Sequence, residues 1–175
     1  LVGGNGCGKS TLLKLLSGLY YPSSGVLYLD DDVLSKPIYP SYRELFSLIF
    51  ADFHIFDRLY GFGEVDTKKV NDLIKLMELD KKTQYVDGKF TETNLSTGQR
   101  KRLALIAAFL ENKPIYMFDE VAADQDPEFR AYFYNELLMD LKKRGKTVIA
   151  ATHDDKYFHV ADRVLKMEYG KIQLT

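Results

Sequence analysis

The apolar residues of this chain follow two different spacings, and these spacings predict its elements. The segment 67–79 places an apolar residue at every third or fourth position, which predicts a helix capped by Asp66. The run TVIAAT at 147–152 is continuous, as in a strand buried on both faces. Helices are predicted at 9–17, 40–46, 67–79, 97–111 and 127–143, and strands at 25–30, 47–51, 115–120, 147–152, 163–169 and 171–174.

This alternation of strands and helices predicts an α/β domain over residues 1–175, with a mainly parallel core sheet and a helical lobe at approximately 52–105. The net charge of -1 gives no electrostatic case for a nucleic-acid partner. The single cysteine, Cys7, excludes an internal disulfide and fits a reducing compartment. The longest apolar run, 103–110, is too short to span a bilayer.

The opening stretch LVGGNGCGKST matches the spacing of a P-loop, Gly-x-x-x-x-Gly-Lys-Ser. Its glycines allow successive N–H groups to face one concavity, and the positive end of the following helix adds to the attraction for phosphate. The predicted nucleotide-binding residues are Gly3, Gly4, Asn5, Gly6, Cys7, Gly8, Lys9, Ser10 and Thr11. Lys9 would reach the β- and γ-phosphates and Ser10 would ligate Mg²⁺.

An ordinary glycine-rich turn is the alternative interpretation, and the strand-loop-helix context weighs against it. Cys7 has no evident histidine partner, so a tolerated small residue is favoured over a nucleophile. Only Leu1 and Val2 precede a loop that ordinarily follows a full strand. We therefore expect the domain to be truncated at its N-terminus.

A pair of carboxylates ends the apolar run IYMFDE at 115–120. Beside a P-loop, Asp119 would hold Mg²⁺ directly or through water, and Glu120 would polarise the attacking water. For an isolated pair, two solvated acids at a strand end would be the better interpretation. The P-loop and the apolar strand favour the catalytic one.

The segment at 95–99 resembles the Leu-Ser-Gly-Gly-Gln signature of ABC ATPases. The order of P-loop, signature, IYMFDE and ATHD at 151–154 matches that family over essentially the whole chain. The signature residues are Leu95, Ser96, Thr97, Gly98 and Gln99. The resemblance implies that two domains pack head to tail around two ATP molecules, each signature contacting the partner's γ-phosphate.

The same resemblance makes His153 a switch histidine that contacts the γ-phosphate, so that the catalytic set is Lys9, Glu120 and His153. A lone histidine after a strand is otherwise more often structural. His54 and His159 are left as surface or packing residues.

Three stretches are similar to one bacterial exporter subfamily: FADFHIFDRLYG, LSTGQRKRLALIAAFLE and FDEVAADQDPEFR. That subfamily handles cyclic peptides, microcin-like peptides and siderophore precursors. Its members fuse a membrane domain upstream of the ATPase domain, which would place this chain at the cytoplasmic face of the bacterial inner membrane.

The sequence departs from the family pattern at several positions. Ala51, followed by Asp52, stands where most ABC ATPases have a glutamine that senses Mg²⁺. Thr97 replaces the first signature glycine, and of the usual Ser-Ala-Leu-Asp loop only Asp126 keeps its place. The aromatic residue that stacks on adenine in the family would lie before Leu1.

A second class of function is a soluble ABC protein that acts as a nucleotide-switched clamp on DNA, a ribosome or an assembly partner. Several apolar stretches of about 20 residues upstream of Leu1 would favour the exporter over this clamp. A P-loop kinase or a GTPase is the third alternative. The signature segment argues against both, because neither class of protein contains it. The Asn-Lys-x-Asp motif with which GTPases recognise guanine is also absent from the sequence.

Overall fold

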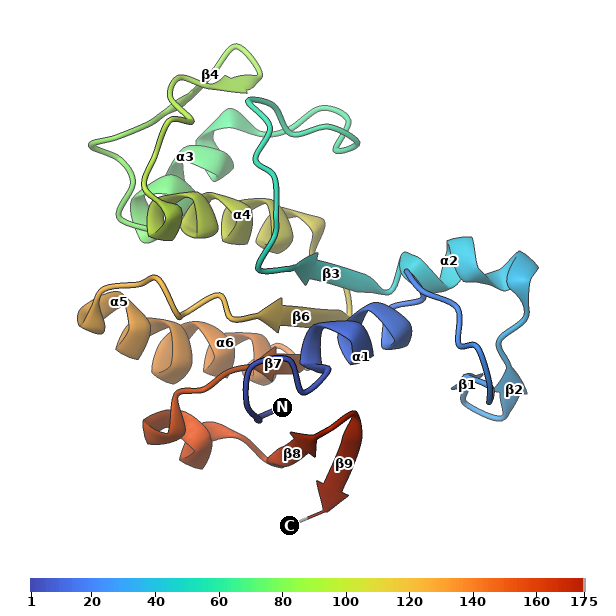
Figure 1. The fold of residues 1–175 in the computed structure, drawn as a ribbon. Helices are drawn as coiled ribbons and strands as arrows, with labels where there is room; N and C mark the ends of the chain where they lie inside the picture. Colours follow the sequence, from blue (N-terminus) through green and yellow to red (C-terminus); the bar gives the residue numbers. More distant parts are fainter. Residues whose placement is uncertain (175) are drawn as a thin grey trace.

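A parallel sheet forms the centre of the molecule (Figure 1). The computed structural model describes residues 1–174; Thr175, the last residue of the predicted domain, lies outside them. Among the described residues, the sheet has the order β3 (Phe46–Ile49), β6 (Ile115–Asp119), β7 (Thr147–Ala151). Both pairs are parallel, with Ile49 opposite Phe118 and Asp119 opposite Ala151. The predicted α/β class is confirmed.

The central strand β6 is buried on both faces, which explains its unbroken apolar sequence. Alternate side chains of a strand point to opposite faces. Tyr116 and Phe118 accordingly belong to one apolar cluster, with α4 and α5, and Met117 belongs to a second cluster, with Leu13 of α1.

A helix forms in each segment predicted to be helical, but the one predicted at 40–46 ends at Arg43, and Phe46 belongs to β3. The helices are α1 (Lys9–Leu16), α2 (Tyr39–Arg43), α3 (Thr67–Leu76), α4 (Thr97–Glu111), α5 (Pro127–Tyr132) and α6 (Leu138–Lys143), with short 3₁₀ turns η1 (Lys36–Ile38) and η3 (Asp155–Val160). Asp66 caps α3 by accepting a hydrogen bond from the N–H of Lys68 at 2.9 Å, as predicted. The helix predicted at 127–143 is continuous, but a π-helical stretch, η2 (Phe133–Leu137), joins α5 to α6.

Helices α3 and α4 and the small hairpin β4 (Tyr85–Val86) and β5 (Lys89–Phe90) lie together at one end of the molecule (Figure 1). Residues 50–66, which lead into this part, contain neither helix nor strand. Helix α4 continues without a break to Glu111, and the lobe boundary near 105 stays a prediction.

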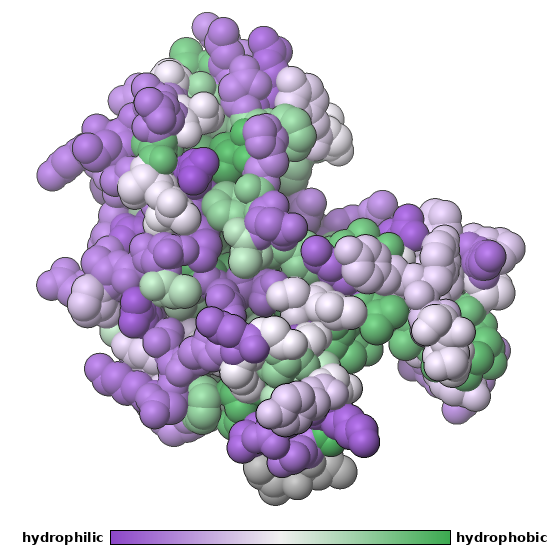
Figure 2. All heavy atoms as spheres, in the orientation of Figure 1, coloured by the Kyte–Doolittle hydropathy of each residue, from purple (hydrophilic) through white to green (hydrophobic). Residues whose placement is uncertain are grey.

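The strand predicted at 25–30 is wrong in extent and place. Only β1 (Tyr28–Leu29) forms, and it pairs antiparallel with β2 (Asp32–Val33) in a hairpin outside the core sheet. The chain turns at Asp30, whose φ is 54°, so the apolar run cannot continue as a strand. The hairpin belongs to the projecting part at the right of Figure 2, where Val26 and Tyr28 are exposed.

The C-terminal strands β8 (Leu165–Glu168) and β9 (Lys171–Leu174) form the predicted hairpin around Gly170. Residues 1 and 2 lie between β7 and β8. Leu1 donates its amino group to Ala150 O at 2.8 Å, and Val2 exchanges backbone bonds with Leu165 and Met167. No helix within residues 1–174 has the length and apolar character needed to cross a membrane.

Candidate active site

The glycine-rich loop and the start of α1 form a surface of free N–H groups. Gly8 is the N-cap of α1, and no side chain caps this end of the helix. The first N–H groups of an uncapped helix, together with its dipole, attract an anion. Residues 4–6, 10 and 11 are exposed, so an anion has access to the loop.

Gly3 allows the loop to pack directly on β8. A Cβ at Gly3 would lie 2.3 Å from the carbonyl oxygen of Met167 and 2.7 Å from Cys7 Sγ. Any other residue at this position would push the loop away from the sheet, whereas a Cβ at Gly4 would meet nothing.

Lys9 is folded back over its own loop. The side chain is only 5% exposed, and Nζ donates to the carbonyls of Gly3 at 3.0 Å and Gly4 at 3.2 Å. The same ammonium lies 3.2 Å from His153 Nε2 and 3.7 Å from Glu120 Oε1. The three predicted catalytic side chains, from α1 and from the ends of β6 and β7, therefore meet at one point.

Glu120 and His153 contact each other directly, with 2.8 Å between Oε1 and Nε2. Nε2 carries at most one proton, so it either donates to Glu120 or accepts from Lys9. The donor role fits better, because Lys9 already has two carbonyl acceptors.

Asp119 is almost fully buried, at 2% exposure, and its Oδ1 has no hydrogen-bond partner. A buried carboxylate oxygen without a partner is costly, and a cation or a water would satisfy it. Within residues 1–174, no cluster of three or more His, Cys, Asp or Glu side chains could hold a metal ion. Mg²⁺ commonly takes one or two protein ligands and completes its shell with phosphate and water. Asp119 and the exposed Ser10 fit that donor set.

The signature forms the N-terminus of α4. Ser96 is the N-cap, and it forms a reciprocal capping box with Gln99, at 3.3 Å and 3.2 Å. Thr97 occupies the first helical position, where a side chain is tolerated. Gly98 is required, because a Cβ there would lie 2.4 Å from the carbonyl oxygen of Asp124. Leu95 is partly buried against the large core cluster.

The loop after Glu120 is bound to this helix. Asp126 caps α5 by accepting from the N–H of Phe129 at 2.9 Å, and it pairs with Arg102 of α4. The pKa of Asp126 lies below its usual range, chiefly because of the Phe129 hydrogen bond, with Arg102 adding to the effect. Gln125 donates to Gly98 O at 3.0 Å and accepts from Arg102 at 2.9 Å.

Ala51 and Asp52 follow β3 and are exposed. The Asp52 carboxylate lies 3.7 Å from Lys14 Nζ on α1. This places the Asp52 side chain in an ion pair with Lys14, so the structure gives no contact through which it replaces the family's glutamine.

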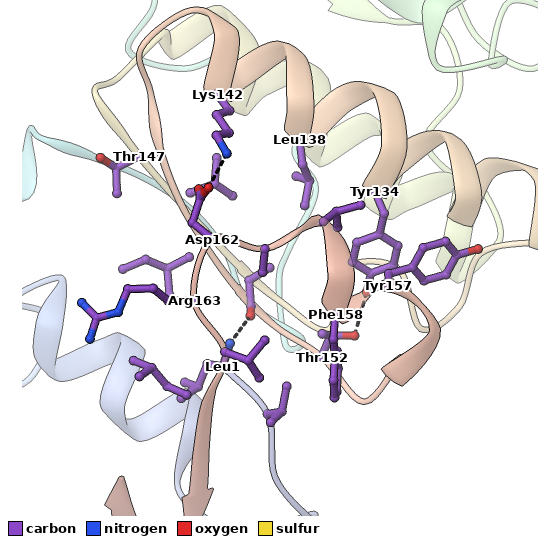
Figure 3. Close-up of a pocket in the computed structure, with 18 of the residues that line it drawn as sticks. Leu1, Tyr134, Leu138, Lys142, Thr147, Thr152, Tyr157, Phe158, Asp162 and Arg163 are labelled. Carbon is purple, nitrogen blue, oxygen red and sulfur yellow. Dashed lines mark hydrogen bonds and ion pairs between the residues drawn. The ribbon is translucent and has the colours of Figure 1, made fainter. Parts of the chain in front are cut away.

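Two residues that the sequence did not single out, Tyr134 and Arg130, hold the segment around His153. The hydroxyl of Tyr134 lies 2.7 Å from Thr152 Oγ1 (Figure 3). The same hydroxyl donates to Asp154 Oδ2 at 3.2 Å, and Arg130 pairs with Asp154 at 3.4 Å. The only sequence feature that pointed to this network is the position of Asp154 next to His153. Tyr134 and Arg130 come from the helical segment 127–143, and their role depends on tertiary contacts.

An apolar cavity of about 480 Å³ lies between α6, β7 and β8 (Figure 3). It shares Tyr134 and Thr152 with the network above, but Lys9, Asp119, Glu120 and His153 do not line it. Its walls offer few polar groups that could hold a phosphate.

Comparisons with known proteins agree on one family. The family described as ABC transporter matches residues 1–123. The ATP-binding protein SyrD of Pseudomonas syringae pv. syringae is 50% identical over 98% of this chain, which spans 31% of that relative.

Two solved structures share the fold. The dimeric ATP-binding cassette MJ0796, bound to ADP and Pi, is 24% identical with a TM-score of 0.81, covering 98% of this chain and 81% of that one. CbiO1 of Clostridium perfringens, part of the transporter complex cbiONQ, is 28% identical with a TM-score of 0.73, covering 99% and 75%.

Modification of Cys7 is expected to block nucleotide binding. Sγ lies 4.0 Å from Lys9 Nζ and packs against Gly3, so the bulk of a maleimide adduct would displace Lys9 and the loop backbone. We expect nucleotide affinity to fall at least about tenfold, a loss of about 1.4 kcal/mol, and ATP to protect the thiol. Fluorescent-nucleotide titration with mass spectrometry measures both. Cys7→Ser should be insensitive to the reagent, and full binding after complete labelling would contradict the prediction.

Tyr134 should make the protein less stable in alkali. Burial raises the pKa of Tyr134, partly opposed by the hydrogen bond to Thr152. The pKa of Tyr134 in the folded protein exceeds the unfolded value of about 10. The contribution of Tyr134 to the free energy of unfolding is therefore fully present below about pH 10 and is lost as the pH rises further. Urea unfolding between about pH 9 and 11 should show a smaller loss for Tyr134→Phe. Tyr169→Phe, at an exposed position, serves as control; an equal loss in both variants would refute this origin.

Proposed function

Because this chain belongs to the ABC transporter family, we propose that it is the ATP-binding and hydrolysing domain of a bacterial exporter, which works as a pair closed around two ATP molecules. The observation that carries this proposal is the meeting of Lys9, Glu120 and His153 at the glycine-rich loop. A phosphate bound by the loop would lie beside a cation, a carboxylate and an imidazole.

Each residue has a distinct role in hydrolysis. The N–H groups of the loop and Lys9 bind the phosphates. To do so, the Lys9 ammonium leaves the carbonyls of Gly3 and Gly4 and donates to phosphate oxygens instead. Glu120 accepts the proton of the attacking water, and His153 holds this carboxylate in place. Mg²⁺ held by Ser10 and Asp119 would neutralise charge on the phosphates.

A second copy of the domain completes the site. In residues 1–174, the contacts of Lys9 reach the loop, Glu120 and His153 and include none of the signature. Ser96 and Thr97 stay exposed at the start of α4. We propose that they contact the γ-phosphate bound by the partner. This assignment rests on the family resemblance.

The proposed membrane partner would dock beside the segment after β3. A groove of about 240 Å³ lies between this segment and α4, and its lining includes Phe53, Ile55 and Phe62. Phe56 and Tyr60, also at this groove, are 58% and 64% exposed. Exposed aromatic groups of this kind suit a protein contact. The contact would hold the domain at the cytoplasmic face of the membrane, and the cargo would be a peptide or a siderophore-like compound.

Glu120→Gln should trap the closed pair. The amide keeps the shape of the side chain but cannot accept a proton, so hydrolysis should fall by about 10²- to 10⁴-fold while ATP still binds. Light scattering of the intact protein in Mg-ATP should then show a stable association of two ATPase domains. Glu128→Gln, at an exposed position on α5, is the matched control. Unaltered turnover in Glu120→Gln would remove Glu120 from its assigned role.

Ser96→Arg tests the shared site. A long cation at the start of α4 should block contact with the partner's phosphate, so turnover should drop by about 100-fold or more. Binding of ATP to a single domain should stay near normal, because Ser96 is not part of its own phosphate loop. Titration of dilute protein with nucleotide measures this. Weakened single-domain binding, or loss of turnover in the exposed control Ser41→Arg, would count against the assignment.

A further inference from the structure

Lys101 is a buried cation on the signature helix that the proposed mechanism does not use. It lies in α4, five residues after Ser96, and is only 3% exposed. Its Nζ donates to the backbone carbonyl of Glu120 at 2.7 Å and pairs with Asp124 Oδ2 at 2.6 Å. The helix that carries the signature is thereby bonded to the backbone of the proposed catalytic base.

The backbone of Glu120 needs such support. Its φ is 54°, a left-handed conformation that is uncommon for a residue with a side chain. Its N–H donates to Ala151 O at 3.0 Å, and its carbonyl accepts from Lys101 and from the N–H of Ala123, the latter at 3.2 Å. With the backbone held on both sides, the side chain is aimed at His153.

Asp124 makes the burial of Lys101 possible. A buried ammonium without a counter-charge is strongly destabilising, and Asp124 supplies that charge from the loop after Glu120. The carbonyl oxygen of Asp124 also packs against Gly98, and Gln125 donates to Gly98 O. The start of α4, this loop and Glu120 are therefore joined by several contacts into one unit.

We propose that Lys101 is a positioning residue, which together with Asp124 transmits the position of the signature helix to Glu120 of the same chain. This inference rests on the proposed function. When the signature of one chain engages the nucleotide of its partner, α4 is fixed, and Lys101 fixes the carbonyl of Glu120 in turn. Occupancy of the partner's site thus sets the geometry of hydrolysis in the chain's own site.

Three variants of the intact protein separate this role from simple stabilisation: Lys101→Met, Asp124→Asn and the double variant. Lys101→Met should lower kcat by about 10- to 100-fold, because displacing a catalytic group by about 1 Å has an effect of this size. KM for ATP should change by less than about threefold, since the phosphate loop is untouched.

The melting temperature gives the second measurement. Asp124→Asn leaves the ammonium of Lys101 buried without its counter-charge and should lower Tm. The double variant removes both charges and should recover Tm. Its kcat should stay low, because the carbonyl of Glu120 still lacks the lysine donor.

Lys113→Met is the matched control. Lys113 pairs with Glu44 at 2.5 Å near the start of β6, at the opposite end of this strand from Glu120, and its removal should leave kcat unchanged. Recovery of kcat together with Tm in the double variant, or normal kcat in Lys101→Met, would overturn the inference alone. Absence of ATP hydrolysis in both the unmodified protein and the control would overturn the proposed function, and the inference with it.

Discussion

The chain turns at the end of β6, and this turn places the carboxylates of Asp119 and Glu120 in different surroundings. Asp119 stays in line with the strand, buried and opposite Ala151. Glu120 takes a left-handed backbone, which directs its side chain toward His153 and its carbonyl toward α4. Because β6 is central in the order β3-β6-β7, this turn lies between the ends of both neighbouring strands. The contacts of Glu120 with His153 and with Lys101 both depend on this turn.

The departures from the family pattern in the loop after Glu120 form a consistent set. Gln125 stands where the family has leucine, and burying an unpaired amide would cost about 1–3 kcal/mol. Both ends of this amide are paired, with Gly98 and with Arg102. Asp124, in place of alanine, pairs with Lys101. The loop therefore exchanges apolar packing for polar contacts with α4.

The sequence predicted those features that depend on local signals. Periodic apolar residues located α3 and α4, and the glycine spacing located the phosphate loop. The hairpin at Asp30 was missed, because the run GVLYLD does not reveal which strand it pairs with. Lys101 and Tyr134 were missed because their partners lie 18 or more residues away in the chain. The convergence of Lys9, Glu120 and His153 followed only from the order of family motifs.

The N-termini of α1 and α4 differ in what a phosphate would have to displace. At α1, Lys9 has to leave two carbonyl groups before it can bind a phosphate. At α4, the Ser96 oxygen accepts from the N–H of Gln99, but a hydroxyl donates and accepts at the same time. Its proton stays available while the capping box is intact. In the proposed pair the signature would therefore be preorganised, so that rearrangement would accompany phosphate binding at the chain's own loop and not contact with a partner.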